Sequence, residues 1–172
     1  FDCYNLTFDY GQKSISEILS MIKYLGSLVG KVEESLNLVN EILQKINTIK
    51  KKTFRIKPKI YFEEWDDPYI SATRWVSEII EISGGVDIFA KKSRSQKALK
   101  RAVSSQDVIN KNPDIIFASW CGKKVNFDKI KKRQGWSSIN AVKTNSLFEI
   151  KSPIILQPGP AALTDGLSQI HD

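Results

Sequence analysis

Few residues in this chain could bind a metal or serve as a catalytic base. Its 172 residues include two cysteines, Cys3 and Cys121, and a single histidine, His171. No CxxC pair is present, so neither a disulfide framework nor a cysteine-histidine zinc site is expected. A catalytic nucleophile needs a base beside it, and His171 is the penultimate residue, where fraying is the default. These shortages argue against an enzyme.

Other familiar signatures are also missing. The sequence has no GxSxG elbow, no HExxH motif and no glycine-rich phosphate loop. No apolar run approaches the roughly 20 residues that a membrane-spanning helix needs. The chain begins at Phe1 and shows no basic, apolar and small signal-peptide pattern. We therefore expect a soluble chain, trimmed or processed from a longer one, with no resident cofactor and no metal site.

The charge that is present is mainly positive. Lys and Arg number 26 against 19 Asp and Glu, for a net charge of +7. The lysines are concentrated at residues 50–52, 91–101 and 123–133. A basic balance is compatible with nucleic acid or another anionic surface as a partner. Solvated surface lysines would give the same composition, and that interpretation is favoured.

Two helices are predicted in the first third of the chain. Ser14 and Glu17 have the spacing of a capping box, which satisfies the first free amides of a helix. A second helix is predicted over residues 31–50, because its apolar residues recur every three and four positions. The pattern covers fewer than three heptads, so one long helix laid against a domain is favoured over a coiled coil. The apolar stripe consists of Val32, Leu36, Val39, Leu43 and Ile46.

The rest of the chain is organised around residues 57–89. Ile60, Tyr61 and Phe62 predict a buried strand, and residues 63–69 predict a loop because Pro68 disfavours helical geometry before it. Ser71 or Thr73 is expected to cap the next helix, which Gly84 and Gly85 would end. In open α/β sheets, ligands bind beyond the carboxyl ends of strands, so this loop is the candidate ligand rim.

Two further strands complete the predicted sheet. They are expected at residues 115–118 and 147–150, with a helix capped by Ser104 and Asp107 before the first of them. A last helix is predicted from Gly159 onward. Strands that alternate with helices indicate an α/β fold: a three-layer lobe with a mainly parallel sheet, preceded by the long helix.

Aromatic residues gather near two of the predicted strand ends. Trp75 falls on the apolar face of its helix and is expected in the core, whereas Trp65 and Trp120 have no place in a helical period. Together with Tyr69 they could form a flat wall for a large planar ligand. The adjacent acid pairs, 63–64 and 66–67, are expected to form a solvated rim rather than an acid-base couple.

The sequence resembles a known family in four runs. YFEEWDDPYISATRWVSEIIEISGGVDIF, SSQDVINKNPDIIFASWCG, RQGWSSINAVKTNSLFEI and LQPGPAALTDGL resemble, in order and spacing, the carboxyl-terminal lobe of cobalamin- and siderophore-type (class III) periplasmic solute-binding proteins. This resemblance implies that residues 1–30 are a remnant of the amino-terminal lobe. Residues 31–52 would be the long connecting helix, and residues 53–172 the carboxyl-terminal α/β lobe.

The resemblance also implies a function. Such proteins capture a metal chelate outside the cell or in the periplasm and hand it to an ABC transporter permease. The tryptophan-aspartate-proline loop and LQPGP look most like the cobalamin-binding subgroup. Members of the family dock on the permease through a glutamate of this lobe. The corresponding position in this chain is Gln106, with Asp107 beside it. The implied ligand contacts are Trp65, Asp66, Tyr69, Trp120 and Gln157.

Alternatives remain at this point. A ferric siderophore or haem could replace the corrinoid, and a basic nucleic-acid-associated domain could use lysines with stacking aromatics. The latter needs lysines and aromatics on one face, whereas acidic residues flank Trp65, so no nucleic-acid partner is expected. A lone lobe is expected to expose part of the stripe on residues 32–46 and to cover it by pairing with a second copy.

Overall fold

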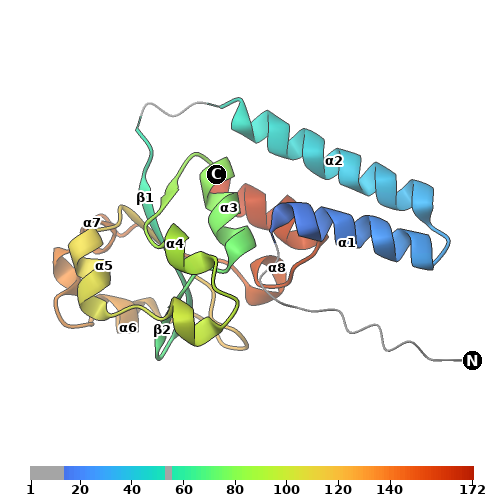
Figure 1. The fold of residues 1–172 in the computed structure, drawn as a ribbon. Helices are drawn as coiled ribbons and strands as arrows, with labels where there is room; N and C mark the ends of the chain where they lie inside the picture. Colours follow the sequence, from blue (N-terminus) through green and yellow to red (C-terminus); the bar gives the residue numbers. More distant parts are fainter. Residues whose placement is uncertain (1–13, 53–55) are drawn as a thin grey trace, which may run out of the picture.

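A computed structural model describes residues 14–52 and 56–172 (Figure 1). Cys3 and residues 1–13 of the predicted amino-terminal remnant lie outside these residues. Within them, no helix has both the length and the apolar character needed to cross a bilayer.

Two antiparallel helices form the first part of the fold. Helix α1 (Ile15–Leu28) begins with the predicted capping box between Ser14 and Glu17, and α2 (Val32–Lys50) is continuous, as predicted. The helices lie side by side, joined by a short turn (Figure 1). They approach closely at Gly26, where an added Cβ would lie 2.3 Å from the Cβ of Ser35.

The sheet has five strands: β1 (Lys59–Asp66), β2 (Tyr69–Ser71), β3 (Val86–Asp87), β4 (Ile115–Ala118) and β5 (Leu147–Glu149). Their order is β2-β1-β4-β5, and β3 pairs with the start of β1. Every pairing is parallel except the hairpin of β1 with β2. The prediction of a mainly parallel sheet is confirmed, with two short strands beyond the three predicted.

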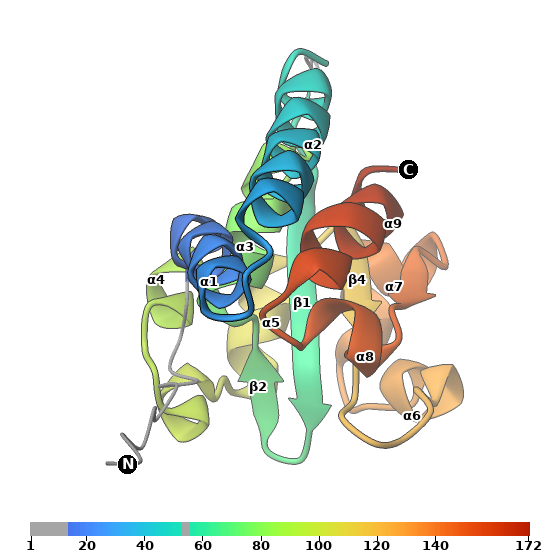
Figure 2. The same cartoon turned by 90° about the vertical axis from the view of Figure 1, so that its right-hand side faces the viewer.

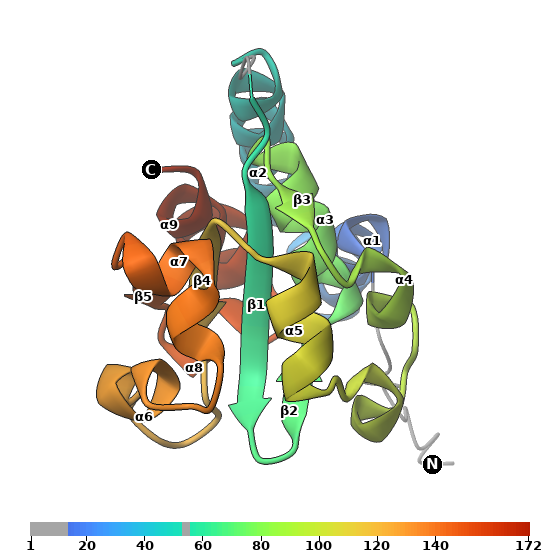
Figure 3. The same ribbon diagram turned by 90° about the vertical axis from the view of Figure 1, so that its left-hand side faces the viewer.

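Helices cover both faces of this sheet. In Figure 2, α1, α2, α3 (Arg74–Ile82), α8 (Ser152–Ile155) and α9 (Leu167–His171) lie in front of it. In Figure 3, α5 (Ser105–Lys111), α6 (Phe127–Lys131) and α7 (Asn140–Lys143) lie in front of the opposite face. The remaining elements are α4 (Ala90–Ser93), the 3-10 turns η1 (Ala98–Arg101) and η2 (Trp136–Ser138), and the π-helical segment η3 (Ala162–Gly166).

The alternation of side chains along β1 divides the core into two clusters. Ile60 and Phe62 pack in the cluster beneath α1, α2, α3 and α9, whereas Tyr61 packs in the cluster beneath α5, α6 and α7. Adjacent residues of a strand point to opposite faces, so one strand contributes to both cores. The result is the three-layer lobe expected from the sequence.

The predicted loop at residues 63–69 is wrong in extent. Strand β1 continues to Asp66, and only Asp67 and Pro68 form the turn before β2. The strand can carry acidic side chains into the core because Arg133 pairs with Glu63, while two lysines pair with Asp66. These ion pairs replace the hydration that an exposed loop would have provided.

Two details of the helices also differ from expectation. Ser71 lies in β2 and donates its hydroxyl to the carbonyl of Arg101, so it caps no helix. Thr73 occupies the N-cap position of α3 without a side-chain capping bond. Along α2, Val39 and Ile46 are buried, whereas the remaining members of the stripe are 39–50% exposed, which confirms the predicted partial exposure; they are Val32, Leu36 and Leu43.

Candidate functional site

An open hollow of about 410 Å³ lies at the carboxyl end of β1. Residues of the β1–β2 turn, the start of α5 and a lysine of α6 border it. This is the sheet edge at which a ligand was predicted. The residues that line it are Asp66, Asp67, Pro68, Tyr69, Val103, Ser105 and Lys129.

A buried ion pair lies next to the hollow. The Arg133 guanidinium donates to both carboxylate oxygens of Glu63, at 2.6 and 2.9 Å. Burial lowers the pKa of Arg133, but the hydrogen bonds and charge of Glu63 more than offset this, and its pKa is raised. The guanidinium also lies 4.3 Å from the centre of the Tyr69 ring, a favourable cation–π distance. This contact holds the Tyr69 ring in place.

Glu63 accepts two further hydrogen bonds from aromatic side chains. The indole nitrogen of Trp120 donates to it at 3.0 Å, and the hydroxyl of Tyr61 donates at 3.2 Å. Burial, followed by the negative charge of Glu63, raises the pKa of Tyr61 well above its ordinary value. The Tyr61 hydroxyl therefore keeps its proton and donates it in a hydrogen bond to Glu63.

Asp66 is the second buried acid, and its side chain is fully buried. One carboxylate oxygen accepts from Lys123, and the other accepts from Lys129 at 2.6 Å. Burial alone raises the pKa of the Asp66 carboxyl, but the hydrogen bonds and charges of the two lysines more than compensate. Its pKa lies below the ordinary value. The same contact raises the pKa of Lys129.

Trp65 covers one of these lysines. Its indole nitrogen donates to the carbonyl of Asp67 at 2.8 Å, and its half-buried ring lies 4.1 Å from the Lys123 ammonium. The same ammonium lies 5.1 Å from the ring of Trp120. Two aromatic rings therefore hold Lys123 against Asp66.

Of the five predicted ligand contacts, Asp66 and Tyr69 line the hollow, and Trp65 lies beside them in the β1–β2 hairpin but not in the lining. Trp120 is 3% exposed, so its ring does not form part of the flat wall expected from the sequence. The Trp120 indole nitrogen donates to the buried Glu63, and this bond keeps the ring inside the lobe. Gln157 is exposed after α8 and is not part of the lining of the hollow. Trp75 is buried, as predicted, and donates to the carbonyl of Ile155.

The acid pairs also differ from their predicted role. They were expected to form a solvated rim, but Glu63 and Asp66 are buried, and Glu64 pairs with the buried Arg101. Only Asp67 is exposed. The strand alternates its side chains between two covered faces, so successive acids each require a separate cation.

The two predicted docking residues lie in the first turn of α5, and both are exposed. Asp107 completes the predicted capping box: it accepts from the Ser104 hydroxyl at 2.7 Å and from the Ser104 backbone amide at 3.2 Å. These bonds lower the pKa of Asp107. Gln106 donates to the Asn110 side chain at 2.8 Å. Their neighbour Ser105 lines the hollow, so this turn lies at its border.

Sequence reasoning missed the cations of the site. Lys123, Lys129 and Arg133 belong to a segment interpreted only as one basic run. The available signal was the acidic strand end itself, because a carboxylate carried into a sheet needs a cationic partner. That argument predicts that partners exist, but it does not select them from 26 basic residues.

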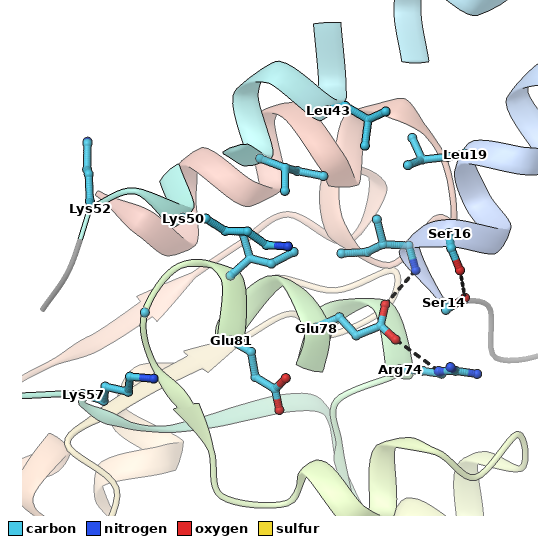
Figure 4. Close-up of a pocket in the computed structure, with 14 residues that line it drawn as sticks. Ser14, Ser16, Leu19, Leu43, Lys50, Lys52, Lys57, Arg74, Glu78 and Glu81 are labelled. Carbon is cyan, nitrogen blue, oxygen red and sulfur yellow. Dashed lines mark hydrogen bonds and ion pairs between the residues drawn. The ribbon is translucent and has the colours of Figure 1, made fainter. Parts of the chain in front are cut away.

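A larger hollow of about 710 Å³ lies between α1, α2 and α3 (Figure 4). The backbone amide of Ile15 donates to Glu78 at 2.7 Å, and Glu78 also pairs with Arg74. Among the described residues, apolar side chains such as those of Leu19 and Leu43 and a charged rim line it, and none of these lining residues is aromatic. This hollow also lies away from the strand ends, so the smaller hollow is the better candidate.

Within residues 14–52 and 56–172, no group of three or more histidine, cysteine or acidic side chains is placed to hold a metal ion. Cys121, which follows Trp120, is exposed and forms no disulfide. Chemistry at the candidate site therefore rests on aromatic rings, carboxylates and lysine ammonium groups.

Known proteins share this sequence and fold. A family model described as periplasmic binding protein matches residues 6–154. YvrC, an uncharacterised ABC transporter substrate-binding lipoprotein of Bacillus subtilis strain 168, is 24% identical over 167 residues, or 93% of this chain and 50% of the relative. The chain thus spans about half the length of that curated relative.

Two solved structures show the same architecture. A Staphylococcus epidermidis periplasmic solute-binding protein, described as a candidate iron-binding protein, aligns with a TM-score of 0.75 and 25% identity, covering 93% of this chain and 62% of its own. The periplasmic vitamin B12 binding protein BtuF of Vibrio cholerae aligns with a TM-score of 0.69 and 21% identity, covering 93% and 61%. At this identity, the likeness to the latter concerns the fold.

Proposed function

The chain belongs to the periplasmic binding protein family, and on that premise we propose that it is the substrate-binding component, or its carboxyl lobe, of an ABC importer for a corrinoid such as cobalamin or a related metal chelate. The family is one of solute-binding proteins and not of enzymes. The observation that carries the proposal is the hollow at the carboxyl end of β1, bordered by aromatic and charged side chains.

The aromatic residues of this edge suit a flat, partly apolar ring. Tyr69 lines the hollow and is fixed from behind by Arg133. Trp65 precedes the lining aspartates and is fixed through its indole hydrogen bond to Asp67. Side chains that are already held in place lose little conformational entropy when a ligand binds. We assign both as ligand contacts.

The remaining predicted residues receive different roles in the proposal. Trp120 supports the site from beneath, because its indole holds Glu63 in place. Gln157 is proposed to contact the ligand from outside the hollow, because its segment does not line it. Gln106 and Asp107 are proposed to contact the ABC transporter permease from the border of the site. The protein would then act outside the cytoplasmic membrane, as its relatives' descriptions imply.

Haem and ferric siderophores are the alternative ligands. The lysines beside the hollow are a reason to keep both as candidates. Single-stranded nucleic acid would need exposed rings for its bases to stack on. Trp120 is buried, and the half-buried Trp65 and Tyr69 do not offer a row of exposed rings for successive bases. A nucleic-acid role therefore has no support at this edge of the sheet.

Titration calorimetry with cobalamin, a ferric siderophore and haem tests the proposal. Saturable binding of cobalamin supports the corrinoid assignment, and binding of another chelate alone would move the ligand to that class. If none of the three binds, the proposed function is wrong.

A further inference from the structure

The contacts of Asp66 point to a more specific ligand. We propose that Lys123 and Lys129 bind an anionic oxygen group of the chelate, a carboxylate or a phosphate, and that Asp66 is their internal counter-ion and not a ligand contact. The inference rests on the proposed function, since it names the class of chelate that the same hollow would take.

Two cations share a single buried carboxylate here. Each oxygen of Asp66 accepts from a different lysine, and the carboxylate itself is fully buried. Both of its oxygens face protein cations, so a ligand could reach it only by displacing a lysine. Asp66 is therefore a positioning residue: it fixes where the two ammonium groups lie.

The lysines, unlike Asp66, remain accessible. The side chain of Lys123 is 41% exposed and that of Lys129 is 55% exposed. An ammonium group has three hydrogen-bond donors, and each lysine directs one bond to Asp66. In the described parts of the chain, neither ammonium group makes another hydrogen bond or ion pair. Donors are thus left for a ligand, and Lys129 already lines the hollow.

The neighbouring ion pair shows what a purely structural pairing looks like. Glu63 has one cation, Arg133, and their side chains are 0% and 6% exposed. A buried charge needs a partner, and there one cation neutralises the carboxylate while Trp120 and Tyr61 donate neutral hydrogen bonds to it. Asp66 has two partners that both reach solvent. The second lysine is more than neutralisation requires, which favours a binding role.

The local charge balance agrees with an anionic ligand. Lys123 and Lys129 place two ammonium groups against the single carboxylate of Asp66, so this cluster keeps a net positive charge. Asp67 lies in the exposed turn, where water and salt screen its charge. A ligand carboxylate or phosphate placed against the lysines would balance the remaining positive charge. The rings of Trp65 and Trp120 would keep Lys123 in position for it.

Three corrinoids that share the same ring but differ in their anionic groups test whether the lysines recognise an anion. Cobinamide carries carboxamide side chains and no phosphate, cobalamin adds a phosphodiester, and cobyrinic acid carries free carboxylates on the same ring. Each is titrated calorimetrically into the full-length protein, into Lys123→Gln and into Lys129→Gln. Either variant leaves Asp66 one lysine, so folding is retained and can be checked by thermal melting. Lys131→Gln is the matched control, since it removes the same charge from an exposed position in α6.

We expect the anionic corrinoids to bind more tightly than cobinamide. Each site variant should weaken binding of the anionic forms by about tenfold, as expected for a hydrogen bond to a charged group, while cobinamide binding changes little. A loss of cobalamin binding alone in the two site variants would identify phosphate as the group recognised, and a loss of cobyrinic acid binding alone would identify carboxylate. Lys131→Gln should match the wild type.

Two results overturn the inference alone. One is cobinamide binding as tightly as both anionic forms, and the other is an equal loss of all three in the site variants. If none of the corrinoids binds the wild-type protein, the corrinoid assignment fails together with the inference, and the proposed function itself is wrong only if haem and the ferric siderophore also fail to bind.

Discussion

Arg133 and Glu63 form a two-bond ion pair inside the lobe, with nitrogen–oxygen distances of 2.6 and 2.9 Å. The arginine follows α6, and the glutamate lies on the central strand β1. The pair therefore ties the cover of the sheet to the strand whose end forms the candidate site. Parallel bonds between a guanidinium and a carboxylate fix orientation as well as distance.

Replacing Arg133 with methionine should destabilise the protein strongly. Glu63 would keep its buried charge without a cation, and breaking a buried pair from one side costs about 3–5 kcal/mol. Urea unfolding at pH 7 measures the change. Lys132→Met, at the neighbouring exposed position, is the control and should lie within about 0.5 kcal/mol of the wild type. A loss below about 1 kcal/mol in Arg133→Met would contradict the importance of the pair.

Much of the fold could be predicted from local patterns. The capping boxes at Ser14 and Ser104, the stripe on α2 and the strand at residues 115–118 each depend on a few neighbouring residues. The length of β1 did not follow from such patterns. Acidic residues next to a proline indicate a loop, unless cations far along the chain pair with them, as Arg133 does with Glu63.

The position of the candidate site could be predicted from the sequence, whereas several of the residues around it could not. Its place at the end of β1 and the nearness of Trp65 to Tyr69 follow from the order of strand and turn. The burial of Trp120 did not, because it depends on an indole bond to Glu63, 57 residues away. The two lysines of Asp66 belong to a basic run in which no residue stands out. Their selection depends on tertiary contacts.

The Asp66 carboxyl should make stability depend on pH. Its folded-state pKa lies below the ordinary value of 3.8, so its contribution is present above that value and is lost as pH falls through the folded pKa. Asp66→Asn should be less stable than wild type at pH 7, and this difference should shrink below about pH 4. Urea unfolding across this range measures it, with the exposed Asp128→Asn as control. A difference that stays constant with pH would argue against the lysine contacts.

Gly26 should tolerate no side chain. A Cβ there would lie 2.3 Å from the Ser35 Cβ and 2.8 Å from the Lys31 carbonyl oxygen, and neither atom is a flexible tip. Gly26→Ala should therefore cost about 1–3 kcal/mol of unfolding free energy by overpacking, in spite of the better helix propensity of alanine. Chemical denaturation gives the value, and Ser27→Ala, at an exposed position of α1, should change it little. A more stable Gly26→Ala protein would mean that α1 and α2 are not in close contact.

The end of the helical pair should mediate self-association. Leu28, Val29, Val32 and Leu36 are 45–69% exposed near the turn between α1 and α2. Exposed apolar surface of this kind is commonly covered by a partner, and we propose a second copy. Sedimentation velocity should show a dimer that Val32→Gln with Leu36→Gln converts to monomer. A strict monomer at every concentration would refute this.

The central claim is that the edge beside Trp65 binds a metal chelate. Calorimetric titration of cobalamin into the wild type and into Trp65→Ala tests it most directly, with Tyr24→Ala, an exposed aromatic residue of α1, as control. Loss of a central aromatic contact costs about 2 kcal/mol or more, so binding should weaken at least about tenfold in Trp65→Ala and stay unchanged in the control. Equal affinity in all three proteins would place the ligand elsewhere, and the absence of cobalamin binding to the wild type would contradict the corrinoid assignment itself.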